Sequence, residues 1–568
     1  MTDGILHRQS SALSLRPPET VMRLARLGAN CQCRLSFIRI LMRRLLRENW
    51  RFDRPKFDID NRGVGVAVYR VKGPVRAYSL VAFAHDLPAD QRSDRVIAEA
   101  WDATFTLFDG EPSDADLQRL SENVPKQEAG RVSSRELTLA RANRSVRLFE
   151  HVADRLATGQ QPDEALVEET GYLMRTTAVY GSGKFGAADH ASIANRPEFE
   201  APFQAEMLTV YLIRAFALDL VEHMADCRSP DTATTIDPGL RRRFGIGNST
   251  GLGMAPFVLN HPMLINNWIT ARETALARVR AELKADPVRI SRIRDLTRRA
   301  GVNAESWQSA HPLQQQKLTA LRSDLSSLNA HLASNVFDQP TPWDRLYSWV
   351  ETNLSVEGQE HAVSLLIDAH GDLTDDLAAT MSANETETFS IDGAMSVGAL
   401  KAALEDVYGF ALAIDWADKA AVDRVWYVSA EKLEPRMGQR FEEEIEAYEQ
   451  PLAPARDAAR MHADLANLPD DEPVAAFLMQ HPEHRHMARR AQQAKRLPYA
   501  EIRDNTIGDD VLPIDILRCK LAFFGAARFD PRSDRWVRIN MFQGAPFFDE
   551  LAASEADDWM YPAETQSP

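Results

Sequence analysis

The sequence contains very little cysteine. Only four of its 568 residues are cysteines: Cys31, Cys33, Cys227 and Cys519. So few cannot form a disulfide framework in a chain of this length, which indicates a reducing, cytoplasmic compartment. Cys31 and Cys33 also lack the second cysteine or histidine pair of a zinc finger, so we expect no zinc there.

Long hydrophobic runs are also lacking. The most apolar stretch, 208–224, is interrupted by Arg214, Asp219 and Glu222, which predicts a buried helix and not a membrane span. The N-terminal stretch 1–18 has no apolar core of the kind found in signal peptides. We therefore expect a soluble protein without membrane association.

An excess of positive charge is absent from the chain as a whole. With 66 Lys and Arg against 82 Asp and Glu, the net charge is −16, which argues against nucleic acid as the main partner. The stretch 34–49 is an exception, because it is rich in arginine and has helical apolar spacing. We expect this helix to dock on an acidic body, and binding to an anionic partner is the alternative. Its docking face comprises Leu35, Ile38, Leu41 and Leu45.

The order of periodic patterns predicts a helix-rich α+β fold. Strands are expected at 63–72, 76–85 and 95–108, joined as an antiparallel meander. Helices are expected at 134–158, 163–177, 203–225 and 261–285, and further strands at 410–415 and 424–430. The predicted parts are a basic helical segment (1–56), a first α+β half (57–260), a helical bridge (261–390) and a second α+β half (391–568).

A weak internal repetition suggests that the two α+β halves are duplicated. The matches at one fixed offset include Ala82, Ala84 and Asp86 with Ala411, Ala413 and Asp415. The tripeptide Ala-Pro-Phe at 255–257 also recurs at 545–547. Duplication predicts that 57–112 and 405–436 form equivalent sheet elements, with Asp86 superposed on Asp415. The alternative is coincidence in an alanine-rich chain.

Two glycine-rich segments are the main candidates for a binding site. They are YGSGKFG at 180–186 and FGIGNSTGLGMAPF at 244–257. Glycine lets the backbone approach a ligand or another element closely, and free amides beside a lysine suit an anion. The first segment is not a nucleotide P-loop, because Phe185 replaces the magnesium-binding Ser or Thr. Helix-capping turns are the alternative interpretation.

We expect both segments to line one cavity. Lys184 would supply positive charge and a catalytic group, and His261 is the nearest candidate proton carrier. The expected substrate-binding residues are Tyr180, Ser182, Asn248 and Thr250. An anionic or carbonyl-bearing small molecule would fit these groups.

The GNSTG sequence at 247–251 matches the pattern of a serine nucleophile elbow. Ser249 would be the nucleophile, with His261 or His370 as the base. An elbow requires a buried strand before the serine and a helix after it, and the flanking RRRF and LGMAP sequences match this context poorly.

Two histidine-containing motifs have metal-ligating residue types. They are Asp368-x-His370-x-Asp372 and His481-x-x-His484-x-His486. Residues two apart on a helix do not share a face, and the second motif lies in an arginine-rich helical context. The sequence therefore predicts no metal site.

These observations favour a metabolic enzyme of undetermined reaction that acts on an anionic small molecule without a tightly bound cofactor. A hydrolase using Ser249 is one alternative. A non-catalytic interaction protein that uses the basic N-terminal helix is another. A homo-oligomer is also compatible with two pseudo-symmetric halves.

Overall fold

The computed structural model describes most of the chain. The described residues are 14–92, 100–126, 130–177, 193, 195–248, 262–309, 312–334, 336–381, 390–418, 427–428, 435–436, 453–503, 513–529, 539–552 and 557–561. Within them the fold is helix-rich α+β, as predicted.

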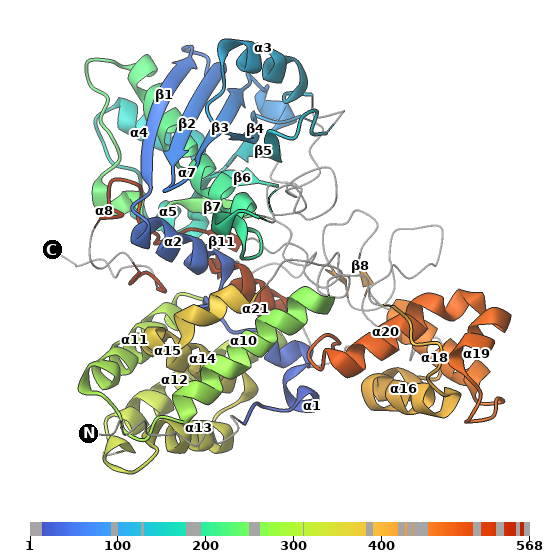
Figure 1. The fold of residues 1–568 in the computed structure, drawn as a ribbon. Coiled ribbons are helices and arrows are strands. Elements are labelled where there is room, and N and C mark those ends of the chain that lie inside the picture. Colours follow the sequence, from blue (N-terminus) through green and yellow to red (C-terminus); the bar gives the residue numbers. More distant parts are fainter. Residues whose placement is uncertain are drawn as a thin grey trace, which may run out of the picture.

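A nine-stranded mixed sheet organises one part of the molecule (Figure 1). Its order is β1-β2-β3-β4-β5-β6-β7-β11-β10. The strands are β1 (Arg51–Ile59), β2 (Gly65–Lys72), β3 (Ala77–Ala84), β4 (Ala103–Asp109), β5 (Glu136–Arg144), β6 (Tyr172–Thr176), β7 (Gly245–Asn248), β10 (Ala526–Phe529) and β11 (Ile539–Met541). Neighbouring strands are antiparallel except β6 and β7, which run parallel. Strands from the C-terminal part of the chain therefore complete a sheet begun near the N-terminus.

The predicted meander is confirmed for β2, β3 and β4, although β4 begins only at Ala103. The edge strand β1 was missed because Pro55 and several charges interrupt its pattern, and its pairing register shifts there, between Asp53 and Lys56. The helices predicted at 134–158 and 163–177 are wrong in part. The first contains β5 before α4 (Phe149–Ala157), and the second is α5 (Glu164–Thr170) followed by β6. Gly171 separates α5 from β6 with a left-handed φ of 70°.

Helices cover both faces of the sheet. The long α7 (Gln204–Arg228) packs against strands β2 to β7 on one face. On the other face, α3 (Asp114–Asn123) contributes Leu120 to a small separate core with Val81 and Leu139. The short α8 (Pro238–Arg241) leads into β7.

A layer of helices forms the second part of the molecule, on the far side of α2 and α21 from the sheet (Figure 1). It comprises α10 (Pro262–Arg280), α11 (Pro287–Glu305), α12 (Pro312–Leu332), α13 (Pro342–Asn353), α14 (Val356–Ala369) and α15 (Gly371–Thr374). The helices α2 (Phe37–Arg47) and α21 (Pro513–Phe524) lie between this layer and the sheet, and the short α1 is Pro18–Val21. One hydrophobic core runs through this layer and the inner face of the sheet, so the two parts are packed together.

A smaller helical unit lies to one side (Figure 1) and has its own core. It consists of α16 (Val397–Leu412), α18 (Ala453–Leu465), α19 (Val474–Gln480) and α20 (Arg485–Arg496). A two-stranded ladder, β8 (Tyr427–Val428) with β9 (Pro435–Arg436), lies between α16 and α18 in sequence.

The internal duplication is not confirmed. Ala82 and Ala84 lie in strand β3, whereas the matching Ala411 lies in helix α16 and Ala413 at its end. The strand predicted at 410–415 is therefore wrong, and Asp86 and Asp415 do not occupy equivalent sheet elements. The apolar spacing of this segment is that of a helix that buries Tyr408 and Ala411.

The docking of the basic helix α2 is confirmed. All four residues of its predicted docking face are at most 1% exposed. Its arginines reach acidic side chains of the helical layer and the C-terminal segment: Arg39 pairs with Asp368 at 3.0 Å and with Asp557 at 3.1 Å. The helix is therefore part of the core, and its apolar face is not free to bind a partner.

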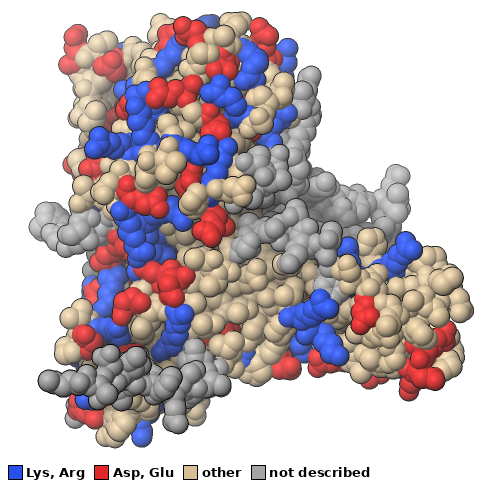
Figure 2. Space-filling view, in the orientation of Figure 1, with Lys and Arg blue, Asp and Glu red and all other residues tan. Residues whose placement is uncertain are grey.

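Charges of both signs alternate on the surface drawn in Figure 2, without a broad area of one sign among the coloured residues. No helix in the described part of the chain is long and apolar enough to cross a lipid bilayer.

Candidate functional site

The two glycine-rich segments leave the sheet from neighbouring strands. β6 ends at Thr176, shortly before the first segment, and β7 ends at Asn248, within the second. The two strands pair in parallel, with Arg175 opposite Gly247, so their carboxyl ends lie side by side. In α/β sheets, the crevice outside the carboxyl ends of parallel strands is the usual place for a ligand.

Of the predicted site residues, only Asn248 is among the described residues. Tyr180, Ser182, Lys184, Ser249, Thr250 and His261 lie outside them, so their convergence on one cavity stays a prediction. Asn248 is completely buried. Its Nδ2 donates to the carbonyl oxygen of Thr176 at 3.3 Å, which ties the ends of β7 and β6 together.

Lys520 is the residue that sequence reasoning missed. It lies on α21 and is 3% exposed, and its Nζ is 3.5 Å from Asn248 Oδ1. Burial lowers the pKa of Lys520 to about 7, because a charged ammonium loses its hydration in the interior. The sequence does contain an indication of this residue. Lys520 lies within the apolar helical run ILRCKLAFF, and a lysine in such a run is expected on a buried helix.

Two arginines lie on the opposite face of the sheet from the Asn248 side chain, because Arg175 is in register with Gly247 and successive side chains of a strand alternate. Arg175 of β6 pairs in register with Asn143 of β5, and side chains alternate along strands, so Arg141 and Arg175 face the same side. Arg175 is 4% exposed, and the guanidinium carbon of Arg141 lies 4.7 Å from the centre of the Trp101 ring. Burial also lowers the pKa of Arg141. The carboxyl end of β6 is thus rich in cationic side chains.

Thr177, the residue after β6, adds a polar group at the same place. Its side-chain oxygen is buried and makes no hydrogen bond within the described part of the chain. Its backbone N–H donates to the carbonyl of Arg141 at 3.0 Å, which fixes the end of β6 against β5. A buried hydroxyl of this kind is available to a ligand.

The first glycines of the second segment have a packing role. A Cβ on Gly247 would lie 2.8 Å from the Tyr172 ring, and a Cβ on Gly245 would lie 2.6 Å from the carbonyl oxygen of Met541. Glycine is therefore required here because other strands approach closely, and these two positions do not by themselves indicate a ligand.

The structure corrects the sequence context of Ser249. A fully buried strand, β7, directly precedes this serine, whereas the RRRF sequence suggested that no buried strand was present. The first half of a nucleophile-elbow context is thus met. His370, the other candidate base, is completely buried in the helical layer, with Nδ1 2.7 Å from the Leu366 carbonyl oxygen and its ring edge-on to Trp343.

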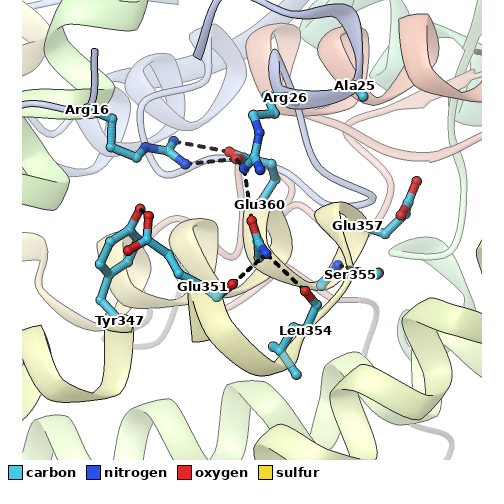
Figure 3. A network of polar contacts seen from close by, with 12 residues as sticks. Arg16, Ala25, Arg26, Tyr347, Glu351, Leu354, Ser355, Glu357 and Glu360 are labelled. Carbon is cyan, nitrogen blue, oxygen red and sulfur yellow. Dashed lines mark hydrogen bonds and ion pairs between the residues drawn. The ribbon is translucent and has the colours of Figure 1, made fainter. Parts of the chain in front are cut away.

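A second buried polar cluster joins the N-terminal segment to α10 and α14, and Figure 3 shows its contacts at Glu360 of α14. Arg16 Nε donates to Glu273 at 2.8 Å, and its Nη1 donates to Glu360 at 2.8 Å. Arg26 reaches Glu360 at 3.0 Å and Gln359 at 2.9 Å. Burial alone would raise the pKa of Glu360, but the guanidinium groups outweigh this effect and hold it at about 2. Because its charges satisfy one another, this cluster has a structural role.

Comparison with protein-family models, with curated proteins and with solved structures finds no match to this chain.

Proposed function

We propose that the protein is an enzyme that acts on an anionic small molecule bound at the carboxyl ends of β6 and β7. The observation that carries this proposal is the buried Lys520, 3.5 Å from Asn248 at the end of β7, with Arg175 buried near the end of the paired strand β6. Removing a cation from water costs several kcal/mol, and a site for an anion is a common reason for proteins to retain such groups.

The side chains have separate roles in this proposal. Arg175 supplies a planar guanidinium suited to a carboxylate or phosphate group. Asn248 and Thr177 supply directional hydrogen bonds. Lys520, with a pKa of about 7, is partly protonated near neutral pH and can therefore both donate and accept a proton.

Ligand binding by single-residue variants tests the proposal. A panel of phosphorylated and carboxylated metabolites would be screened by thermal shift, because a ligand that binds the native state raises the melting temperature. For a ligand found in this way, Arg175→Gln and Lys520→Met should each weaken binding by about 1.5–3 kcal/mol. Lys284→Met, at an exposed lysine, is the matched control and should bind as the wild type does. Equal binding by all four proteins would refute the proposal.

A hydrolase that uses Ser249 is the second candidate. The observation that favours it is the buried strand directly before this serine, with Lys520 in contact with the adjacent Asn248. A lysine with a lowered pKa can activate a serine hydroxyl, so Lys520 replaces His261 as the expected base. Covalent labelling by a fluorophosphonate should occur in the wild type and be lost in Ser249→Ala. Labelling of both proteins, or of neither, would exclude this candidate.

A further inference from the structure

Four metal-ligating side chains meet in the small helical unit, away from the sheet. They are Asp464, His481, Glu483 and His484, and each offers a ligand atom within 4.8 Å of the others. Asp464 lies one residue before the end of α18, and the other three lie in the connection between α19 and α20. The helix α20 begins only at Arg485, so the objection that residues on one helix diverge does not apply to His481 and His484.

The cluster is already held together by direct contacts. His484 Nε2 is 2.7 Å from Asp464 Oδ2, and His481 Nδ1 is 3.3 Å from Glu483 Oε1. The Phe477 ring stacks on both imidazoles, with interplanar angles of 27° and 9°. Two rings fixed in this way lose little rotational freedom when they bind an ion.

The burial pattern suits an ion that enters from solvent. The His484 side chain is 7% exposed and forms the floor, whereas those of Asp464 and Glu483 are 45% and 61% exposed. Two imidazole nitrogens and two carboxylate oxygens are a donor set that zinc accepts in tetrahedral geometry. Tetrahedral zinc places its ligand atoms about 3.4 Å apart. Side-chain rotations that move these ligand atoms by roughly 1 Å would therefore complete the site.

We propose that Asp464, His481, Glu483 and His484 bind a divalent transition-metal ion, with zinc the best fit. The ion would join the C-terminal end of α18 to the α19–α20 connection. It would replace the two separate histidine–carboxylate pairs by one four-coordinate centre. Sequence spacing alone did not reveal this site, because Asp464 comes from another helix.

Zinc binding by the full chain tests the proposal. Protein stripped with a chelator and dialysed would be titrated with zinc in competition with a chromophoric chelator. We expect one zinc per chain, and a melting temperature that rises with zinc. His481→Ala/His484→Ala should weaken binding by about 100-fold or more, because half of the ligands are lost. His462→Ala is the matched control, since its ring pairs with Glu405 at 3.1 Å in the same unit but outside the cluster.

A second variant avoids the buried histidine. Asp464→Asn/Glu483→Gln changes two accessible side chains with little change of shape, and should weaken zinc binding by at least about tenfold. Cobalt in place of zinc should give the visible absorption of a four-coordinate centre in the wild type and not in either double variant. Equal zinc affinity in the wild type and both double variants would overturn the proposal. So would a wild type that binds zinc no better than the triple variant His462→Ala/His481→Ala/His484→Ala.

Discussion

Lys520 Nζ lies 3.5 Å from Asn248 Oδ1, and both side chains are at least 97% buried. An ammonium at this depth has lost most of its hydration, and burial lowers the pKa of Lys520 to about 7. The position therefore combines a cost in stability with a group that titrates near neutral pH, a combination typical of functional sites.

Lys520→Met should stabilise the protein in a pH-dependent way. In the unfolded chain Lys520 regains its usual pKa of about 10.4, so between pH 7 and roughly 10.4 the unfolded state binds more protons than the native state. The burial penalty is thus complete below pH 7 and fades as pH rises toward 10.4. We expect the variant to exceed the wild type by on the order of 3 kcal/mol at pH 7, and by much less at pH 10. Urea unfolding at several pH values measures this.

The exposed Lys284→Met is the control for that comparison, and its effect should not vary with pH. A stability difference for Lys520→Met that is the same at pH 7 and pH 10 would show that Lys520 is not neutralised by burial.

Local patterns were sufficient to predict the fold class, the β2–β3 hairpin and the docking of α2, because each depends on periodicity within a single element. They failed at β5, whose side chains are buried on both faces: its alternation of polar and apolar residues changes phase between Leu139 and Ala140, so neither face is apolar throughout. The site was predictable only as far as Asn248. Lys520 is 272 positions from Asn248 in the sequence and reaches it only through tertiary packing. Asp464 and His484 of the proposed metal site are 20 positions apart and lie on different elements. Rules based on residue spacing within one element cannot predict either contact.

Gly247→Ala should destabilise the protein. A Cβ at this position would lie 2.8 Å from Cγ of Tyr172, and an aromatic ring buried in the sheet cannot move aside easily. We expect a loss of about 1–3 kcal/mol, the usual range for overpacking. Gly301→Ala is the matched control, because a Cβ there meets nothing within 4 Å and the residue lies in α11. That change should stabilise by roughly 0.5–1 kcal/mol. Denaturant unfolding measures both, and a neutral Gly247→Ala would mean that the packing argument is wrong.

Leu41→Ala should show that α2 belongs to the core. Leu41 is 1% exposed on the docked face of this helix, and truncating a buried leucine costs about 2–5 kcal/mol through lost burial and a residual cavity. Leu283→Ala makes the same chemical change at a side chain that is 72% exposed and should have an effect below about 0.5 kcal/mol. Similar unfolding midpoints for the two variants would contradict the docking of α2.

Glu360→Gln should be among the most destabilising changes that preserve side-chain shape. After this change, the two cations Arg16 and Arg272 share a single carboxylate of the cluster, that of Glu273. One buried positive charge is then uncompensated, which costs about 3–5 kcal/mol of stability. Glu282→Gln removes the charge from a half-exposed pair with Arg289 and should cost no more than about 1 kcal/mol.

The pH dependence of the Glu360→Gln effect follows from the lowered pKa of about 2. The carboxylate stabilises the native state fully above its unfolded pKa of about 4.3, and this contribution is lost as pH falls toward 2. The difference in unfolding free energy between wild type and variant should therefore be constant from pH 7 to about 5 and should shrink at pH 3.5. Urea unfolding at these pH values measures it. A difference that grows on acidification would mean that the cluster does not hold Glu360 as a carboxylate.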